Sequence, residues 1–490
     1  MNDQQRAGDP AVVIVGAGFA GLGMAIQLKR AGVEGFVVLE KADEVGGTWR
    51  DNRYPGCACD VQSHLYSYSF EPNPAWSRMF AEQQEIWDYL KHCAEKYRIT
   101  PHIRFGTELV GAEYDDATGT WRVRTNRGAI TTRALVLATG PLHQPAYPDI
   151  PGIDRFRGKA FHSAEWDHGY DLAGKRVAVI GTGASAIQFV PRIAPRVDRL
   201  HLFQRTPPWI LPKPDRSISP LEQRLFRAVP ALQRLYRSAI YWTLEARILG
   251  FTVHPRLMKL AEAVARQHLR RQVPDPELRR KLTPDYTIGC KRILISNDYY
   301  PALTRPNVEL VTDGIAEIRE HAVVTRDGVE RPVDAIIYGT GFHVIDAFDH
   351  LDIVGRDGLK LREAWSGGVE AYLGVTVAGF PNLFFLLGPN SGLGHSSMVF
   401  MIEAQVRYVL QALRPLLRGD ARAVDVRADV QATFNQRLQA RLREAVWGIG
   451  GCRSWYLDEN GVNRALWPGS TAEYWLRTRR LKPAEYRIEA

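Results

Sequence analysis

The stretch that decides the fold is Val12-Val13-Ile14-Val15-Gly16-Ala17-Gly18-Phe19-Ala20-Gly21, an apolar strand that enters a Gly-x-Gly-x-x-Gly turn. A helix-forming segment follows, and a second apolar strand ends at Glu40. This order is typical of a βαβ unit that binds a dinucleotide. The first glycine allows the tight turn, the second lets the backbone approach a pyrophosphate, and the third lets the helix pack on the strand. We therefore expect Gly16, Gly18 and Gly21 to form a cofactor site.

The same unit occurs a second time. The strand Val177-Ala178-Val179-Ile180 enters Gly181-Thr182-Gly183-Ala184-Ser185-Ala186, and the next strand ends at Arg205. Glu40 and Arg205 each lie 24 positions after the first glycine of their unit. At that position a carboxylate binds a free ribose diol, whereas an arginine fits a 2′-phosphate. Glu40 thus indicates FAD or NAD and Arg205 indicates NADP, so the sequence predicts a flavoprotein reduced by NADPH. The predicted NADP contacts are Gly181, Gly183, Ala184, Ser185, Arg205 and Thr206.

Three further apolar segments complete the architecture. Residues 134–140 and 335–341 both end in Thr-Gly, and residues 383–387 enter a glycine-rich loop and a helix that begins at about Met398. The pattern predicts an α/β fold with two Rossmann-like dinucleotide-binding domains, one for FAD and one for NADP. We expect the FAD domain to be split into residues 1–148 and 350–490, around an NADP domain of residues 149–349.

Length and composition indicate a large cytoplasmic enzyme. The polar segment Met1–Pro10 has no features of a secretory signal, and no apolar run approaches the roughly 20 residues of a membrane span. The five cysteines are scattered and odd in number, which fits a reducing compartment better than a disulfide framework. We also expect no bound metal and no nucleic-acid partner.

The excess positive charge is concentrated in one stretch. Residues 217–281 hold thirteen Lys and Arg against five Asp and Glu, a net of +8 within a chain total of +9. We expect residues 217–283 to be a helical insertion in the NADP domain, with a solvated basic face over an apolar stripe. An attraction for anionic NADPH, or a peripheral contact with an anionic membrane surface, is an open alternative. The stripe consists of Leu221, Leu225, Leu232, Leu235 and Ile240.

Two longer patterns carry a family resemblance. Phe156-x-Gly158-x-x-x-His162-x-x-x-Trp166-Asp167 lies just before the second glycine unit and resembles the fingerprint of type I Baeyer–Villiger monooxygenases. The related flavin-containing monooxygenases carry Tyr or Phe in place of Trp166. A second family pattern is matched by Gly47-Thr48-Trp49, Tyr54-Pro55-Gly56 and Asp60. Both patterns and both glycine turns occur in the family's order, so the resemblance covers essentially the whole chain.

The resemblance implies roles for individual residues. Arg292 is expected to be the catalytic cation beside flavin and nicotinamide, where a fixed guanidinium stabilises anionic oxygen. Asp60 is expected to orient Arg292, and Lys291 to share the NADP 2′-phosphate with Arg205. Other expected flavin-side contacts are Gly47, Thr48 and Trp49.

Two residues of the fingerprint and the C-terminal stretch carry further expectations. Trp166 is expected to be a core aromatic residue, and His162 is linked in the family to domain movement rather than to acid–base chemistry. The aromatic C-terminal stretch resembles a mobile loop that closes over the cofactor, with Trp455 as a wall of the substrate pocket. A packed C-terminal tail is the alternative for that stretch.

The implied reaction is the NADPH- and O2-dependent conversion of a ketone into an ester or lactone through a flavin peroxide. Two alternatives use the same cofactors: an S- or N-oxygenating flavin monooxygenase, and a non-oxygenating NADPH-flavin reductase or redox-regulated binding protein. Cys57-Ala58-Cys59 raises a disulfide reductase as a rival, but its one-residue spacing would strain a disulfide, and we expect packing cysteines there.

Overall fold

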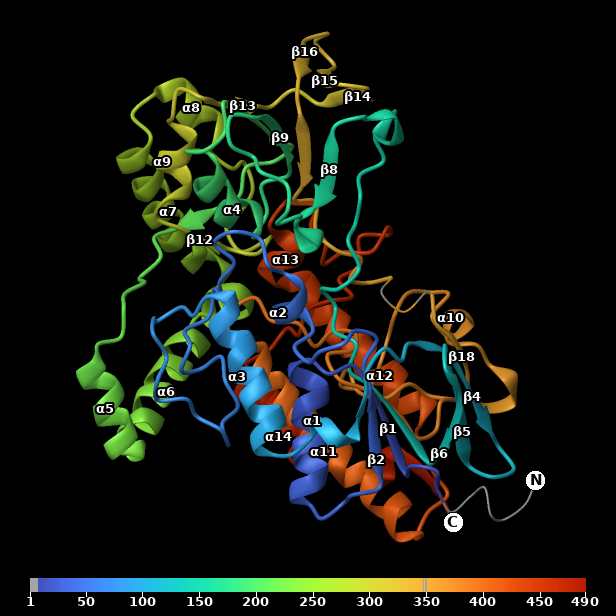
Figure 1. Cartoon of the computed structure of the whole chain (residues 1–490). Coiled ribbons are helices and arrows are strands. Elements are labelled where there is room, and N and C mark those ends of the chain that lie inside the picture. The colour runs from blue at the N-terminus through green and yellow to red at the C-terminus, as the bar shows by residue number, and fades with distance from the viewer. Residues whose placement is uncertain (1–7, 347, 349) are drawn as a thin grey trace.

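The computed structural model describes residues 8–346, 348 and 350–490. It contains two parallel five-stranded sheets, which confirms the predicted α/β class with two Rossmann-like domains. The first sheet has the order β19-β7-β1-β2-β3 and the second the order β13-β10-β9-β17-β8. Their central strands are nearly continuous apolar runs because both faces of each sheet are buried. Helices pack on one face of each sheet, and a smaller sheet packs on the other. Figure 1 shows β1 and β2 in the lower part of the molecule and β8 and β9 in the upper part.

The first sheet takes strands from both ends of the chain, and the second from its middle. In the first sheet, Val12 of β1 is in register with Phe36 of β2 and Ala134 of β7. In the second sheet, Val177 of β9 is in register with Leu200 of β10 and Ala335 of β17. The strands are β1 Val12–Val15, β2 Phe36–Leu39, β3 Ile103–Arg104, β7 Ala134–Leu137 and β19 Leu383–Phe385, and then β8 Lys159–His162, β9 Arg176–Ile180, β10 Arg199–Phe203, β13 Val308–Val311 and β17 Ala335–Tyr338.

Smaller sheets decorate the two large ones. The orders are β18-β4-β5-β6, β14-β15-β16, β11-β12 and β20-β21. Their bounds are β4 Leu109–Asp115, β5 Thr120–Thr125, β6 Gly128–Thr132, β11 Ile210–Leu211, β12 Leu294–Ile295, β14 Ile315–Arg319, β15 Ala322–Thr325, β16 Glu330–Pro332, β18 Asp352–Val354, β20 Ala423–Val426 and β21 Tyr486–Glu489.

The helices that follow the glycine turns pack on the sheets. Helix α1 is buried along nearly its whole length and contacts α11, whose start at Met398 agrees with the sequence. Ser397 caps α11 by accepting a hydrogen bond from the Val399 amide (3.3 Å). The helices are α1 Phe19–Arg30, α2 Thr48–Asp51, α3 Gln83–Lys96, α4 Ala186–Ile193, α5 Pro220–Ala228, α6 Pro230–Glu245, α7 Met258–Gln272, α8 Pro276–Lys281, α9 Tyr299–Leu303, α10 Leu361–Ala364, α11 Met398–Arg418, α12 Ala428–Glu444, α13 Val446–Ile449 and α14 Thr471–Thr478.

The basic stretch folds into α5, α6, α7 and α8, and Figure 1 shows α5 and α6 at the edge of the molecule. The prediction that its apolar stripe lies beneath a basic face is wrong for most of the stripe. Leu221, Leu225 and Leu235 are exposed, and of the five stripe residues only Ile240 is buried. Pro230 divides the segment that carries the stripe into α5 and α6, and the outer side of each helix is left uncovered. No helix among the described residues is long and apolar enough to cross a membrane.

The cysteine prediction needs one correction. Cys290 and Cys452 form a disulfide across a sequence separation of 162 residues, which the spacing of cysteines along the chain did not indicate. Cys57, Cys59 and Cys93 are buried thiols outside any disulfide of the described residues. Burial raises the pKa of the Cys57 thiol to about 12 and raises that of Cys59 as well. Both thiols therefore stay protonated at neutral pH, which agrees with packing cysteines rather than a redox pair.

Candidate active site

The first glycine turn is built by contacts that only glycine permits. Gly16 has φ +103°, and a Cβ there would lie 2.5 Å from the carbonyl oxygen of Ala138. A Cβ on Gly21 would lie 1.8 Å from the carbonyl oxygen of Gly16. The backbone of Gly18 instead lines a cavity, in front of the N-terminus of α1. Exposed amides and the positive end of the helix dipole at such a place favour an anionic group.

Glu40 ends β2 in a buried position, with 4% of its surface exposed. Its carboxylate accepts hydrogen bonds from the amide of Ala17 (2.8 Å), the amide of Ala42 (3.0 Å) and the Arg50 guanidinium (2.9 Å). The residue therefore fixes the glycine turn from behind, and it also lines the cavity, where the sequence expects a ribose.

The second turn repeats this construction with a more open front. Gly181 has φ +109°, and a Cβ there would lie 2.3 Å from the carbonyl oxygen of Gly339. A Cβ on Gly183 would meet no atom within 4 Å, so space for a ligand lies directly before this backbone. Ala184 and Ser185 line the same cavity at the start of α4.

A pair of cations stands beside the second turn. Arg205 is exposed, and Arg205, Thr206 and Lys291 all line the cavity. Lys291 Nζ lies 4.9 Å from the ring centre of Tyr286. Burial, and then the positive charge of Arg205, lower the pKa of Lys291. Two cations that repel each other and face open space suit a dianionic phosphate.

Both turns open on one cavity of about 1360 Å³, larger than the 300–1,000 Å³ typical of a site for one small ligand. The cavity wall also contains unsatisfied polar atoms. The Oγ1 of Thr139 and the Oγ of Ser396 are buried and have no hydrogen-bond partner among the described residues. These atoms, the two turns and the volume fit two dinucleotides that meet inside one cavity.

An ion pair lies in the wall of this cavity, and it joins residues 232 positions apart. Arg292 donates from Nη2 and Nε to one carboxylate oxygen of Asp60, at 2.7 and 3.0 Å. Its Nη1 donates to the carbonyl oxygen of Leu393 (3.0 Å). The Asp60 carboxylate raises the pKa of Arg292 further above its usual value, so the guanidinium is a permanent cation. The sequence-predicted pair Arg292 and Asp60 is thus brought together, with 28% and 32% of the side chains exposed toward the cavity.

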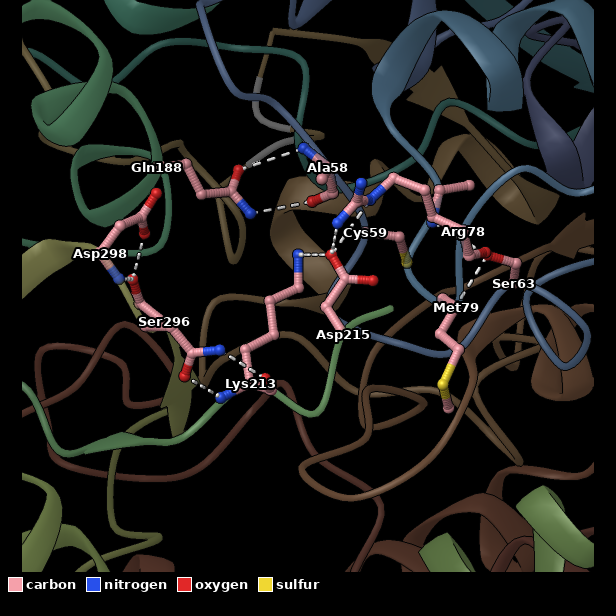
Figure 2. A network of polar contacts seen from close by, with 12 residues as sticks. Ala58, Cys59, Ser63, Arg78, Met79, Gln188, Lys213, Asp215, Ser296 and Asp298 are labelled. Atoms are coloured by element: carbon pink, nitrogen blue, oxygen red, sulfur yellow. Dashed lines mark hydrogen bonds and ion pairs between the residues drawn. The ribbon is translucent and has the colours of Figure 1, made fainter. Parts of the chain in front are cut away.

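A polar network holds the segments on either side of this pair (Figure 2). Arg78 donates to one carboxylate oxygen of Asp215 at 2.9 and 3.2 Å, and Lys213 Nζ lies 3.7 Å from the same oxygen. The side chain of Gln188 bonds both backbone groups of Ala58, two residues before Asp60. These contacts join residues 58–79, which flank Asp60, to residues 188–215 of the middle part of the chain.

The tryptophan pattern also reaches the cavity. Gly47 adopts φ +52° and ψ −126° at the start of α2, a conformation that favours glycine. Thr48 and Trp49 follow it, and all three residues line the cavity. Trp49 is buried, and its indole N–H donates to the hydroxyl of Tyr66 (3.1 Å).

The fingerprint residues, in contrast, lie outside the cavity and build the second sheet's edge. A Cβ on Gly158 would lie 2.6 Å from the carbonyl oxygen of Asp334 and 2.6 Å from the Phe156 ring. Asp167 forms an ion pair with Lys159 of β8. The half-buried Trp166 packs on Phe161 and Phe189, in agreement with the prediction of a core aromatic residue.

His162 is fully buried in β8, where its Nδ1 accepts a hydrogen bond from the amide of Ala164 (3.1 Å). Burial lowers the pKa of this imidazole. A neutral histidine outside the cavity is not placed to exchange protons there, consistent with the sequence-based view that His162 is not the base.

The C-terminal stretch is packed in part and open in part. Trp455 is half exposed and lines the cavity, whereas Tyr456, Leu466 and Trp467 are buried. Sequence reasoning passed over Leu393, whose carbonyl oxygen accepts from Arg292, and Gln188, which bonds the backbone of Ala58 two residues before Asp60. The place of Gln188 in the helix after the second glycine turn is the one sequence signal that could have identified it. Leu393 acts through its backbone carbonyl, which every residue has, so the sequence carries no signal for it. No group of three or more metal-ligating side chains gathers in the described ranges.

Comparisons with known proteins agree with this geometry. Residues 13–241 match the family described as pyridine nucleotide-disulphide oxidoreductase. A Baeyer–Villiger monooxygenase of Pseudomonas aeruginosa is 53% identical over 97% of this chain and 91% of its own. A solved steroid monooxygenase bound to NADP has 32% identity and a TM-score of 0.87, over 98% of this chain and 99% of its own. A structure of OTEMO in complex with FAD and NADP has 28% identity and a TM-score of 0.88, over 98% of this chain and 100% of its own.

The predicted resemblance is therefore confirmed over nearly the full length of this chain and of the Pseudomonas aeruginosa relative. The two glycine turns, the cavity that they share and the Arg292–Asp60 pair in its wall occur in a chain with the sequence of this family. The chain belongs to the Baeyer–Villiger monooxygenase family.

Proposed function

We propose that the chain converts a small-molecule ketone into an ester or lactone with NADPH and O2, with FAD at the first glycine turn and NADPH at the second. The observation that carries the proposal is the Arg292–Asp60 ion pair in the wall of the one cavity that both turns share. In this arrangement the FAD domain comprises residues 1–148 and 350–490, and the NADP domain residues 149–349. The basic helices 217–283 are then an insertion in the NADP domain.

The residues present fit both cofactors. Gly16, Gly18 and Gly21 with the start of α1 suit the FAD pyrophosphate, and Glu40 its ribose. The open backbone at Gly183, with Ala184 and Ser185, suits the NADPH pyrophosphate. Arg205, Lys291 and the Thr206 hydroxyl suit the 2′-phosphate. Bound FAD, once reduced by NADPH, supplies the oxygen chemistry of the reaction.

Arg292 supplies fixed positive charge where anionic oxygen develops. Its guanidinium cannot lose its proton at neutral pH, and Asp60 and the Leu393 carbonyl hold it in one orientation. Trp455 lines the cavity and is the proposed wall of the ketone pocket. The fingerprint residues Phe156, Gly158, His162, Trp166 and Asp167 then support the NADP domain from outside the cavity.

The test compares Arg292→Ala with Arg292→Lys. Loss of the guanidinium is expected to reduce ester formation by about 10²–10³-fold while the protein retains FAD. The lysine variant keeps a charge but loses the paired donors, so it should recover part of the activity. Ester and hydrogen peroxide are quantified per NADPH consumed, with a panel of cyclic, linear and aromatic ketones. Unchanged ester formation by Arg292→Ala would remove the catalytic role.

The same assay separates the alternatives. Oxidation of sulfides or amines with no ester from any ketone would identify an S- or N-oxygenating enzyme. Stoichiometric hydrogen peroxide with every substrate would identify an NADPH-flavin reductase.

We propose a cytoplasmic location with peripheral membrane contact through the insertion. Ten of the seventeen exposed large apolar side chains of the described residues lie between Leu221 and Val264, and Trp242 is 62% exposed. Arg224, Arg227 and Arg234 are exposed beside them. Apolar side chains flanked by arginines are the composition of a surface that lies on anionic lipid, and tryptophan favours the headgroup region.

Vesicle flotation tests this contact. The wild type should float with vesicles that contain phosphatidylglycerol and not with pure phosphatidylcholine. Trp242→Glu should abolish flotation, whereas the control Leu476→Glu, at an equally exposed leucine of α14, should not. If the wild type does not float, the surface faces solvent and the membrane contact is wrong. If the wild type is a dimer without lipid and Trp242→Glu dissociates it, the surface binds a second copy of the chain instead.

A further inference from the structure

The segment that leads to Asp60 is held from the second domain by one amide side chain. Gln188 of α4 donates from Nε2 to the carbonyl oxygen of Ala58 (2.9 Å) and accepts from the amide of Ala58 at Oε1 (3.3 Å). Figure 2 shows these two contacts side by side. The Gln188 amide therefore pairs with Ala58 as a neighbouring strand would.

The opposite edge of the segment is paired within the first domain. The carbonyl oxygen of Cys57 accepts from the amide of Gln83 (2.9 Å), and the amide of Cys59 donates to Ala81 (3.0 Å). The segment 57–59 thus forms an isolated β-bridge with its own domain on one edge, between Ala58 and Glu82, and bonds Gln188 on the other edge. A change in the position of α4 acts on the second edge alone.

Further contacts make the connection between α4 and this segment close. Gln188 Oε1 also accepts a hydrogen bond from the hydroxyl of Tyr54 (2.9 Å), and the Tyr54 ring packs edge-on against Phe189 at 6.0 Å. Gly56 has φ +80°, and a Cβ there would lie 2.8 Å from the carbonyl oxygen of Gln188. The loop before Asp60 therefore lies directly on the helix.

The two ends of this connection are the two functional places of the cavity. Helix α4 begins directly after the open turn at Gly183, where the proposed function puts the NADPH pyrophosphate. Asp60 lies two residues after Ala58 and accepts two of the three hydrogen bonds that orient Arg292. Gln188 is the side chain between them.

We propose that Gln188 is a positioning residue that couples the dinucleotide at the second turn to the orientation of Asp60 and Arg292. The inference rests on the proposed function for the identity of the dinucleotide. A glutamine suits the role because its amide is donor and acceptor at once, and Ala58 needs both. Glutamate at the same place only accepts at neutral pH, and methionine has the length but does neither with comparable strength.

Hydrogen exchange of the FAD-loaded protein, with and without NADP+, tests the coupling. In the wild type, NADP+ should slow exchange in a peptide that contains the Ala58 amide. In Gln188→Met that exchange should be about tenfold faster, as for the loss of one to two hydrogen bonds, and NADP+ should no longer slow it. Gln188→Glu keeps the acceptor and should show an intermediate rate. The NADP+ dissociation constant should change less than about twofold, because Gln188 is not a phosphate ligand in this proposal.

Gln272→Met is the matched control, because Gln272 also donates to a backbone carbonyl, that of Asn297 (2.8 Å), but on the basic insertion. It should leave Ala58 exchange and its response to NADP+ unchanged. During turnover, Gln188→Met should release more hydrogen peroxide per NADPH than the control.

Two results would overturn the coupling. One is an NADP+ response at Ala58 that survives in Gln188→Met. The other is a loss of NADP+ binding in that variant, which would make Gln188 part of the binding site. Exchange needs no turnover, so a wild type that forms no ester would overturn the proposed function while the coupling stays measurable.

Discussion

The two glycine units have the same strand order and the same 24-residue spacing, yet they end in opposite environments. Glu40 is buried, and protein groups already occupy its carboxylate. Arg205 is exposed, and its neighbour Lys291 has a pKa that this positive charge helps to lower. The first unit is thus finished in the sense that the protein itself compensates the charge of Glu40, whereas the second keeps uncompensated positive charge. A finished site suits a cofactor that stays bound, and a charged open one suits a cofactor that must leave after each cycle.

The largest expected effect comes from breaking the finished unit. Glu40→Ala removes a buried carboxylate from Arg50 and from two backbone amides. We expect the free energy of unfolding to fall by about 3–5 kcal/mol, because two backbone amides lose their acceptor and Arg50, which keeps Asp51, loses one of its two carboxylate partners. Urea unfolding and FAD content per chain measure the effect. Glu40→Gln keeps the shape and one acceptor, so its loss should be smaller, and equal losses would contradict the ion-pair explanation.

A second comparison separates the two glycines of the open unit. Gly181→Ala forces a Cβ against the Gly339 carbonyl at a positive φ, and should cost about 2–4 kcal/mol of unfolding free energy. Gly183→Ala meets open space and should leave the unfolding free energy unchanged. The same methyl group would stand where a pyrophosphate approaches, so NADPH affinity should fall. Destabilisation by Gly183→Ala, or unchanged affinity, would contradict the assignment of open space to a ligand.

The third effect concerns the choice between NADPH and NADH. Arg205→Ala removes a cation that faces the proposed 2′-phosphate, and should weaken NADPH binding by about 10- to 100-fold. NADH lacks this phosphate, so its affinity should change little. Dissociation constants for both nucleotides, measured on the same preparation, give the ratio. Equal weakening of both would show that Arg205 serves the fold or the pyrophosphate.

How far the sequence predicts this molecule depends on how local each feature is. Both glycine turns, the strands around them and the start of α11 follow from short patterns, and the structure has them as expected. The members of the Arg292–Asp60 pair are 232 residues apart, so their contact could be predicted only from the family resemblance and not from their spacing.

Features that depend on tertiary contacts could not be predicted from the sequence. The contact of Gln188 with Ala58 and the disulfide between Cys290 and Cys452 join distant segments without a local pattern. The exposure of the apolar stripe on the insertion also depends on tertiary contacts. Helical periodicity identifies a face, but the other elements decide whether anything covers it.

The smallest effect is a pH dependence that tests whether Arg205 and Lys291 act together. Burial and the Arg205 charge lower the pKa of Lys291, so its ammonium group loses its proton at a pH below the usual pKa of 10.5. Binding of a phosphate dianion needs the charged form. NADPH affinity should therefore fall by about fivefold as pH rises through this lowered pKa, and NADH affinity should not.

Lys291→Arg should remove the fall, because a guanidinium stays protonated over this range. In Arg205→Ala the fall should move to higher pH, because one of the two causes that lower the Lys291 pKa is gone while burial remains. If NADPH affinity falls at the same pH in the wild type and in Arg205→Ala, the two cations do not share one phosphate. Recognition of the 2′-phosphate by the second glycine unit would then depend on Arg205 alone. The difference between the two units would reduce to one side chain, Arg205 in place of Glu40.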